Sequence, residues 1–283
     1  MKCTTVLGFL VLSLVGIAVS CAKEEVIPYN KPDSKLMPVD PTEQAIYHIR
    51  KEYQTKIIYR YDRRYLAASA FAAPPEKDLV LPYIENVVRK LFIAPYERQK
   101  SDFMREHMPI EIILFGTSIG NYVEGGENNF SASGVAAGLT RITLTGINSY
   151  NPNSRSYMQA QHATFHHEMA HILTKIYGRP KGFDNVSKGL YAGGASYNSF
   201  SLAEVRNRGF WRNYGMINEN EDFATWVDGI VTTPKQQMLD IVAANNLLSQ
   251  KYQMIYNFYL DKGIDIHVLQ EYLQSLIDKL EEE

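Results

Sequence analysis

Apolar runs in the first half of the chain predict β-strands. The segment PIEIILFG (109–116) is a short apolar run closed by glycine, which is typical of a buried central strand. The pattern of TKIIYRYD (55–62) predicts a second strand. In LTRITLTG (139–146) apolar and polar residues alternate. This alternation predicts a strand with one solvated face, and it favours the edge of a sheet, with an ordinary internal strand as the alternative. A loop rich in Gly, Asn and Ser (120–138) precedes it.

Helical periodicity dominates elsewhere. Residues 82–96 place their apolar side chains on one helical face, and Pro82 stands at the start. A long helix is predicted for 154–178, with a serine at its start and a glycine at its end. After a poorly periodic region to about residue 215, further helical patterns cover 218–230, 233–260 and 264–281. Because strands come first and helices dominate afterwards, the expected fold class is α+β.

The N-terminus has the pattern of an export signal. Residues 1–20 begin with a basic residue, continue with an apolar run too short to span a bilayer, and end in small residues before Cys21. The sequence AVSC resembles a bacterial lipobox, which implies that Cys21 is lipidated. An ordinary signal peptide with a chance cysteine is the alternative. Since the other cysteine, Cys3, lies inside the signal, the exported chain has no pair with which to form a disulfide.

Residues 21–41 have the composition of a flexible tether, with four prolines, many charges and no apolar period. From residue 42 to 283 there is no second linker and no internal repeat, so one folded domain is expected. The formal net charge is −2, and acidic and basic residues are interleaved. Without a basic stripe, nucleic acid is not an expected partner.

The segment ATFHHEMAHILTK (163–175) carries the candidate chemistry. Residues four apart on a helix share a face, and His167 and His171 have this spacing with Glu168 between them, in the pattern His-Glu-x-x-His. This pattern predicts two zinc ligands and a general base next to the first of them. Apolar residues on the back face, at positions 169, 172, 173 and 176, fit a helix that packs on a core. His162 and His166 have the same spacing but enclose no base, and we expect exposed or hydrogen-bonded side chains without a catalytic role.

A catalytic zinc site normally has three protein ligands and one open position. The metzincin class is excluded, since it would need glycine at 174 and histidine at 177, where the chain has Thr174 and Tyr177. The third ligand must therefore come from elsewhere, and the next carboxylate-rich helix, 213–229, is the obvious source. Spacing alone does not choose among its four candidates, which are Glu219, Glu221, Asp222 and Asp228.

The segment YGMINENEDFA (214–224) resembles the zinc-ligand helix of lethal-factor-type gluzincins. The resemblance implies that Glu221, 50 residues after His171, is the third zinc ligand. It also implies that Tyr214, seven residues before Glu221, donates a hydrogen bond to the oxyanion of the tetrahedral intermediate. Where that family commonly has an acidic residue four positions after the ligand, this chain has Thr225. Support for the ligands is therefore expected from Asp222 or Asp228.

The lipoprotein signal, the His-Glu-x-x-His pattern and the downstream glutamate together resemble the zinc-binding metallopeptidase lipoproteins of Bacteroides-type bacteria. The resemblance implies a zincin-like domain with a small mixed sheet, an active-site helix and a mainly helical C-terminal half. It also implies an association with nutrient-import systems. The following CAKEE resembles the signal that carries such lipoproteins to the cell surface, so the expected location is the outer membrane, facing outwards or towards the periplasm.

These observations predict a metallopeptidase with one zinc ion and a peptide or protein substrate. Bound zinc lowers the pKa of its water to about 7, Glu168 takes the proton, and Tyr214 with the metal stabilises the oxyanion. An extended peptide could pair with the strand at 139–146. Two other functions stay open on the sequence. The first is a lipoprotein of an uptake complex that binds substrate without turnover, and the second is a zinc amidase acting on a non-protein amide.

Overall fold

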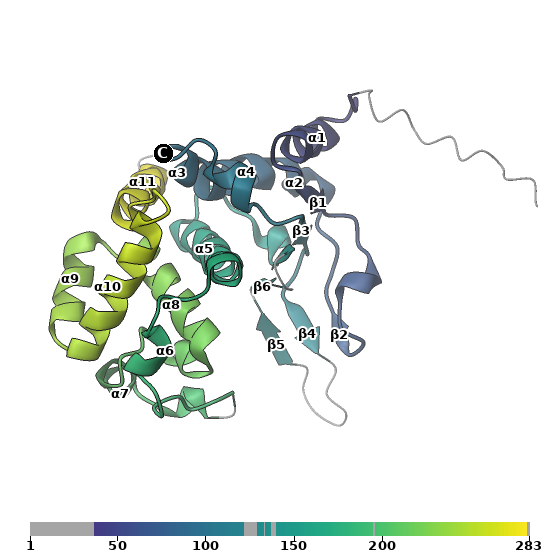
Figure 1. The fold of residues 1–283 in the computed structure, drawn as a ribbon. Coiled ribbons are helices and arrows are strands. Elements are labelled where there is room, and N and C mark those ends of the chain that lie inside the picture. Colours follow the sequence, from purple (N-terminus) through teal and green to yellow (C-terminus); the bar gives the residue numbers. More distant parts are fainter. Residues whose placement is uncertain (1–36, 122–128, 133, 137–139, 195, 282–283) are drawn as a thin grey trace, which may run out of the picture. The chain divides into compact units, whose positions relative to one another are not determined.

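The computed structural model describes residues 37–121, 129–132, 134–136, 140–194 and 196–281 (Figure 1). Pro38–Glu283 form one compact unit. The predicted signal segment 1–20, Cys21 and the predicted tether up to residue 36 lie outside the described residues. At the end of that tether, Asp40 caps the first helix and Pro41 begins it. Within the described ranges, every helix is too short or too polar to cross a bilayer.

The described chain is a mixed α+β structure in which helices predominate, as predicted. The helices are α1 (Pro41–Tyr53), α2 (Lys77–Tyr83), a π-helix (Ile84–Ile93), α3 (Ala94–Glu97), α4 (Phe103–His107), α5 (Arg155–Tyr177), α6 (Phe183–Val186), α7 (Leu202–Asn207), α8 (Glu219–Thr232), α9 (Lys235–Ala243), α10 (Asn246–Leu260) and α11 (Ile266–Asp278). Short 3₁₀ turns occur as well, and the one that matters for the site is η5 (Asn213–Met216).

The strands form two small sheets. They are β1 (Lys56–Ile58), β2 (Ala70–Phe71), β3 (Glu111–Leu114), β4 (Ile119–Asn121), β5 (Asn129–Ala132), β6 (Gly134–Ala136) and β7 (Arg141–Leu144). The larger sheet has the order β1-β3-β7-β6, and the smaller has the order β2-β4-β5. In the larger sheet β1, β3 and β7 are parallel, whereas β6 pairs antiparallel with β7. The sheet is therefore mixed, and β3 is a central strand as predicted.

The sequence prediction for the strand at 139–146 was wrong in its position within the sheet. β7 lies between β3 and β6, so it is internal, and Ile142, Thr143 and Leu144 are all buried. A threonine that satisfies its hydroxyl locally can occupy a buried strand position, so the alternation did not mean a wet face. The edge strands of this sheet are β1 and β6. β5, β6 and most of β4 lie in the region predicted as a loop.

Two helix predictions need correction. The helix predicted to begin at Pro82 begins at Lys77, and Pro82 lies inside α2, whose last residue is followed directly by the π-helix. Proline lacks an N–H, so the regular bond pattern fails there and a wider turn follows. The segment 233–260 is two helices, because the Asn245 side chain accepts from the amides of Leu247 and Leu248 and starts α10 afresh.

Helix α5 is the centre of the fold. Figure 1 shows the strands on one side of α5 and the helices α8 to α11 on the other, and the contacts of α5 with β6, β7, α8 and α11 agree. The residues Phe165, Met169 and Leu173 of α5 are fully buried in the main core. Ile176, expected on the same apolar face, is 47% exposed because the last turn of the helix extends past the core. The buried part of α5 is thus held from both sides.

Candidate metal centre

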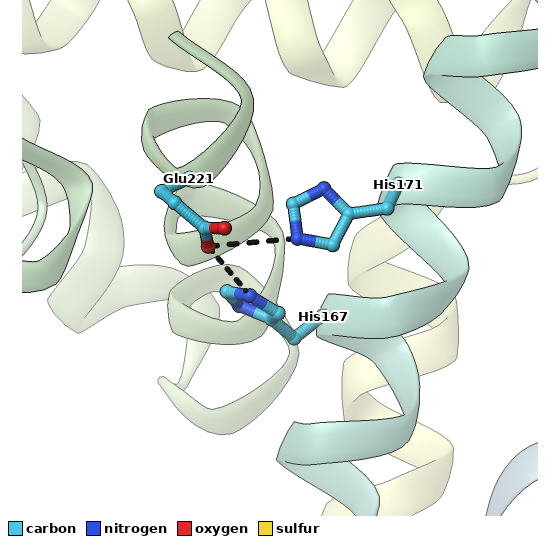
Figure 2. A group of neighbouring side chains, drawn as sticks. All are labelled: His167, His171 and Glu221. Carbon is cyan, nitrogen blue, oxygen red and sulfur yellow. Dashed lines mark hydrogen bonds and ion pairs between the residues drawn. The ribbon is translucent and has the colours of Figure 1, made fainter. Parts of the chain in front are cut away.

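Local sequence signals fix the ends of α5. The Ser154 hydroxyl accepts from the amide of Tyr157 at 3.3 Å, and Gly178, with a φ of +76°, ends the helix. Between these ends, His167 and His171 stand one turn apart and point towards α8 (Figure 2). The two rings lie 4.9 Å apart at 83° to each other.

Helix α8 brings the carboxylate. The Asn218 side chain accepts from the amides of Asn220 and Glu221, at 2.9 and 3.1 Å, and so caps the first turn. Acidic residues in this turn also lie at the positive end of the helix dipole. The close packing of α8 on α5 turns Glu221 towards the histidine pair (Figure 2). The convergence expected from the sequence is therefore present in the fold.

The three side chains fit a zinc ion. Glu221 Oε2 lies 3.1 Å from His167 Nε2 and 3.5 Å from His171 Nε2, and the ligand atoms all lie within 4.8 Å of one another (Figure 2). Ligands at about 2.0–2.1 Å from a tetrahedral zinc stand about 3.3 Å apart, and the two measured distances lie on either side of that value. Two imidazoles and one carboxylate are also a donor set that zinc accepts in catalytic sites.

His167 is oriented from behind by Asp228. Its Nδ1–H donates to Asp228 Oδ2 at 2.8 Å, which leaves Nε2 to face Glu221. Asp228 in turn accepts from Arg212 Nη2 at 2.6 Å. A carboxylate on the far nitrogen fixes both the tautomer and the ring orientation of a histidine ligand. Of the two acidic residues expected to give support, only Asp228 has this contact, since Asp222 faces α10 and pairs with Lys251.

A signal for Asp228 was present in the sequence. Glu221 and Asp228 are seven residues apart, which is about two turns of an α-helix, so they share a face. Asp222 points about 100° away from Glu221. Arg212 is the functional residue that sequence reasoning missed, because nothing in the local pattern joins it to a carboxylate 16 residues later.

The charges at the site shift the pKa values of its side chains. Burial lowers the pKa of His167, but the hydrogen bonds to Asp228 and Glu221 outweigh it and raise that pKa to about 9 in the metal-free protein. Burial raises the pKa of Glu221, and the hydrogen bonds from His167 and His171 outweigh it and lower that pKa to about 2. Glu221 is therefore ionised at neutral pH, as a metal ligand must be.

The two other predicted residues lie beside this group. Glu168 is buried, directly after His167 on α5. Tyr214 belongs to η5 and is 37% exposed, and its ring centre lies 6.0 Å from that of His167. Partial burial, followed by the charges of Glu221 and Glu168, raises the pKa of Tyr214 to about 12. The hydroxyl thus keeps its proton at neutral pH and can donate it in a hydrogen bond.

His162 and His166 lie in the core, so neither is exposed, and for His166 the hydrogen-bonded alternative of the prediction is the one observed. His166 Nε2–H donates to the Leu91 carbonyl at 3.2 Å, and its Nδ1 shares a hydrogen bond with the Tyr96 hydroxyl at 2.9 Å. Burial lowers the pKa of His162 to about 4 and that of His166 to about 3. Both rings are therefore neutral, and His166 anchors α5 to the π-helix and α3.

Within the described residues, His167, His171 and Glu221 are the one group of three or more such side chains that could hold a metal ion. Two histidines and a glutamate that meet between two helices of a mixed α+β domain are the donor set of a candidate zinc site. Residues 43–268 match the model of the family described as "Putative zinc-binding metallo-peptidase", and the chain belongs to this family.

A solved structure shares the fold. It is the crystal structure of a "putative zinc-binding metallo-peptidase" from Bacteroides caccae ATCC 43185, with a TM-score of 0.65 and 20% sequence identity. The similarity covers 86% of this chain and 94% of the other. Among curated protein sequences, none matches the chain. The matched family segment contains both α5 and α8, so the two helices that carry the candidate ligands lie inside it.

Proposed function

We propose that this protein is a zinc-dependent metallopeptidase of the gluzincin type that hydrolyses peptide bonds. The observation that carries the proposal is the meeting of His167, His171 and Glu221, whose ligand atoms all lie within 4.8 Å of one another, with Glu168 directly after His167 in α5. The resemblance of 214–224 to lethal-factor-type gluzincins supports the same assignment, and so does the family to which the chain belongs. His167, His171 and Glu221 would hold one zinc ion.

When bound, a zinc ion supplies Lewis acidity, which lowers the pKa of water to about 7 and polarises a carbonyl. The protein's own groups supply the rest of the chemistry. Glu168 accepts the proton of the attacking water and passes it to the leaving amine. Tyr214 donates its hydroxyl hydrogen to the oxyanion that forms on the substrate carbonyl. Asp228 keeps the His167 ring in its ligating orientation throughout.

The larger sheet offers a place for an extended substrate. One of its two edge strands is β6, which contacts α5, the helix that carries the histidines. A peptide that pairs with the outer edge of β6 would have its backbone held next to the metal centre. This supports a peptide or protein substrate, in keeping with the sequence prediction of strand pairing, although the strand is β6 and not the one predicted.

The first test compares wild-type protein with Glu168→Gln and, as a control of the same charge change, Glu219→Gln at the start of α8. Metal content is measured, and cleavage of a proteome-derived peptide library is mapped by mass spectrometry. Glu168→Gln is expected to bind zinc and to lose about 10²–10⁴-fold in rate, because the proton acceptor is gone. Glu219→Gln should cleave like the wild type. Zinc binding without cleavage by any form would favour the non-catalytic binding lipoprotein instead, and cleavage confined to cell-wall peptides added to the library would favour the amidase.

We also propose that Cys21 carries a lipid that anchors the protein in the outer membrane, at the cell surface or facing the periplasm, in association with a nutrient-import complex. The support is the lipobox-like AVSC and the resemblance to Bacteroides-type lipoproteins. The test is metabolic labelling with a fatty-acid analogue. Cys21→Ala should lose the label and leave the membrane fraction, whereas Cys3→Ala should keep both. A labelled Cys21→Ala protein contradicts the anchor, and protease treatment of intact cells decides which way the protein faces.

A further inference from the structure

A buried ion pair joins the first turn of α8 to α10 and has no part in the proposed chemistry. Lys251 of α10 donates to Asp222 of α8, with 2.6 Å between Nζ and Oδ2, and neither side chain has any exposed area. The Tyr191 hydroxyl donates to the same oxygen at 2.9 Å. The ammonium lies over aromatic rings, with 4.1 Å to the centre of Phe210 and 5.5 Å to that of Phe183.

Such a pair is not an efficient source of stability. Removing two charges from water costs several kcal/mol for each ion, and their attraction in the interior repays this only with good geometry. Apolar residues of the same volume are often as stable or more so. In some proteins a buried pair instead specifies one arrangement of the elements that carry it. The position of this pair in the fold therefore indicates its role.

Asp222 directly follows Glu221 in the first turn of α8. Successive helical residues point about 100° apart, so Glu221 faces α5 while Asp222 faces α10. The first turn of a helix lacks half of its backbone hydrogen bonds and is otherwise held here by the Asn218 cap. A fixed Asp222 consequently limits how far the Glu221 carboxylate can move.

Asp222 also lies against the segment that carries Tyr214. A Cβ atom at Gly215 would lie 3.3 Å from Asp222 Cα and 2.6 Å from Thr225 Oγ1, so the backbone of η5 packs on α8 at a residue that has no side chain. The neighbouring Met216 carbonyl accepts from the amides of Ala192 and Gly193, next to Tyr191. Asp222 is thus a common point of α8, η5 and residues 191–193.

We propose that Lys251 is a positioning residue of the metal centre. By holding Asp222, it fixes the first turn of α8 and the adjoining η5, so that Glu221 and Tyr214 keep their places relative to the histidine pair. This inference rests on the proposed function for its catalytic meaning. Its structural part, the rigidity of the first turn of α8, is independent of any metal.

The test replaces Lys251 by methionine in the full chain. The matched control is Tyr252→Phe, which removes a buried hydrogen bond from the next residue of α10, the 2.6 Å contact between the Tyr252 hydroxyl and His267 of α11, and leaves the ion pair in place. Three quantities are compared: zinc affinity, kcat and KM at saturating zinc, and hydrogen exchange of the amides of 219–224 in the metal-free protein.

Lys251→Met should weaken zinc binding by about 10-fold, within the range seen when partners of metal ligands are lost. At saturating zinc it should lower kcat with little change in KM, because Tyr214 is displaced while the substrate-binding strand is untouched. Amide exchange in 219–224 should be faster. Tyr252→Phe should match the wild type in all three. Tyr191→Phe, which removes one hydroxyl and leaves no charge unpaired, should change each quantity in the same direction as Lys251→Met by a smaller amount.

If Lys251→Met does not fold, the double variant Lys251→Met/Asp222→Asn, which buries no charge, takes its place with the same expectations. Tyr191→Phe, which keeps both charges, tests the same three quantities independently. The inference is overturned if a folded variant binds zinc and exchanges its α8 amides as the wild type does. A wild-type protein that binds no zinc would instead overturn the proposed function. Exchange in the metal-free protein would still decide the positioning role.

Discussion

Gly229 of α8 lies so close to Trp211 that a methyl group cannot be added without displacing the indole. A Cβ atom built at Gly229 would lie 2.2, 2.4 and 2.5 Å from three atoms of the Trp211 ring system. Unstrained carbon contacts are about 3.5–4.0 Å, so the ring would have to move by more than about 1 Å. Trp211 has Arg206 over its ring at 4.9 Å and Trp226 at 5.6 Å, which restrict where it can go.

Two opposing effects decide the sign of Gly229→Ala. Alanine favours a helix interior over glycine by about 1 kcal/mol. Overpacking a core costs about 1–3 kcal/mol, and the overlap with three ring atoms points to the upper end of that range. We therefore expect a net loss of about 2 kcal/mol in the free energy of unfolding.

The displacement should also reach the metal centre. Trp211 is followed directly by Arg212, which donates to Asp228, and Asp228 orients His167. Zinc affinity should consequently fall together with stability. The assay is urea unfolding of the metal-free protein and a zinc titration against a chelating dye. Gly194→Ala is the control, because a Cβ there meets nothing within 4 Å. The control should be as stable as the wild type or up to about 1 kcal/mol more stable.

A Gly229→Ala protein that unfolds at the same or higher urea concentration than the wild type, with unchanged zinc affinity, would refute this reasoning. It would mean that Trp211 can move at no cost and that its displacement does not change the position of Arg212. A loss of stability alone, with normal zinc binding, would uphold the packing argument and reject the link to the metal centre.

Three further predictions concern single side chains. Asp228→Asn should weaken zinc binding by about 10–100-fold, since an amide is a poorer acceptor for the His167 ring, and an unchanged titration against a dye would contradict this. Tyr214→Phe should lower kcat by about 10²–10³-fold with KM and zinc affinity unchanged, and steady-state kinetics that retain kcat would remove the tyrosine from the mechanism. His162→Leu should make the protein less sensitive to acid. The folded pKa of His162, about 4, lies below its ordinary value of 6.5, so its contribution to stability is complete above pH 6.5 and is lost as the pH falls towards 4. Without that histidine, the free energy of unfolding should fall between pH 6.5 and 4 by up to about 3 kcal/mol less than in the wild type. Urea unfolding at several pH values measures this fall, and the same fall in both proteins would argue against a neutral buried ring.

The histidine pair could be predicted from the sequence because its geometry is local. Four residues on one helix fix the relation of His167 to His171 whatever surrounds them. The third ligand could not be chosen in this way, since Glu221 comes from a different helix and its approach depends on how α8 packs on α5. Resemblance to a known family selected it, and the distances in the fold agree.

The errors in the fold have a similar origin. Whether β7 is internal depends on β6, which begins ten residues before the end of β7 in a segment with the composition of a loop. The buried hydrogen bonds of His166 depend on the π-helix and α3, which lie about seventy residues earlier in the chain. Local periodicity predicted most of the helices and strands. Which of their faces are buried depends on segments that are distant in the sequence.

Two helices contribute the ligands of the metal centre, and Glu221 follows His171 by 50 positions in the chain. The ligands come from different helices, so the binding pocket for the ion exists only where α5 and α8 are docked. Metal binding would therefore report that α5 and α8 have docked. A chain that ended anywhere between 178 and 218 would keep both histidines, would lack Glu221 and would not complete the site.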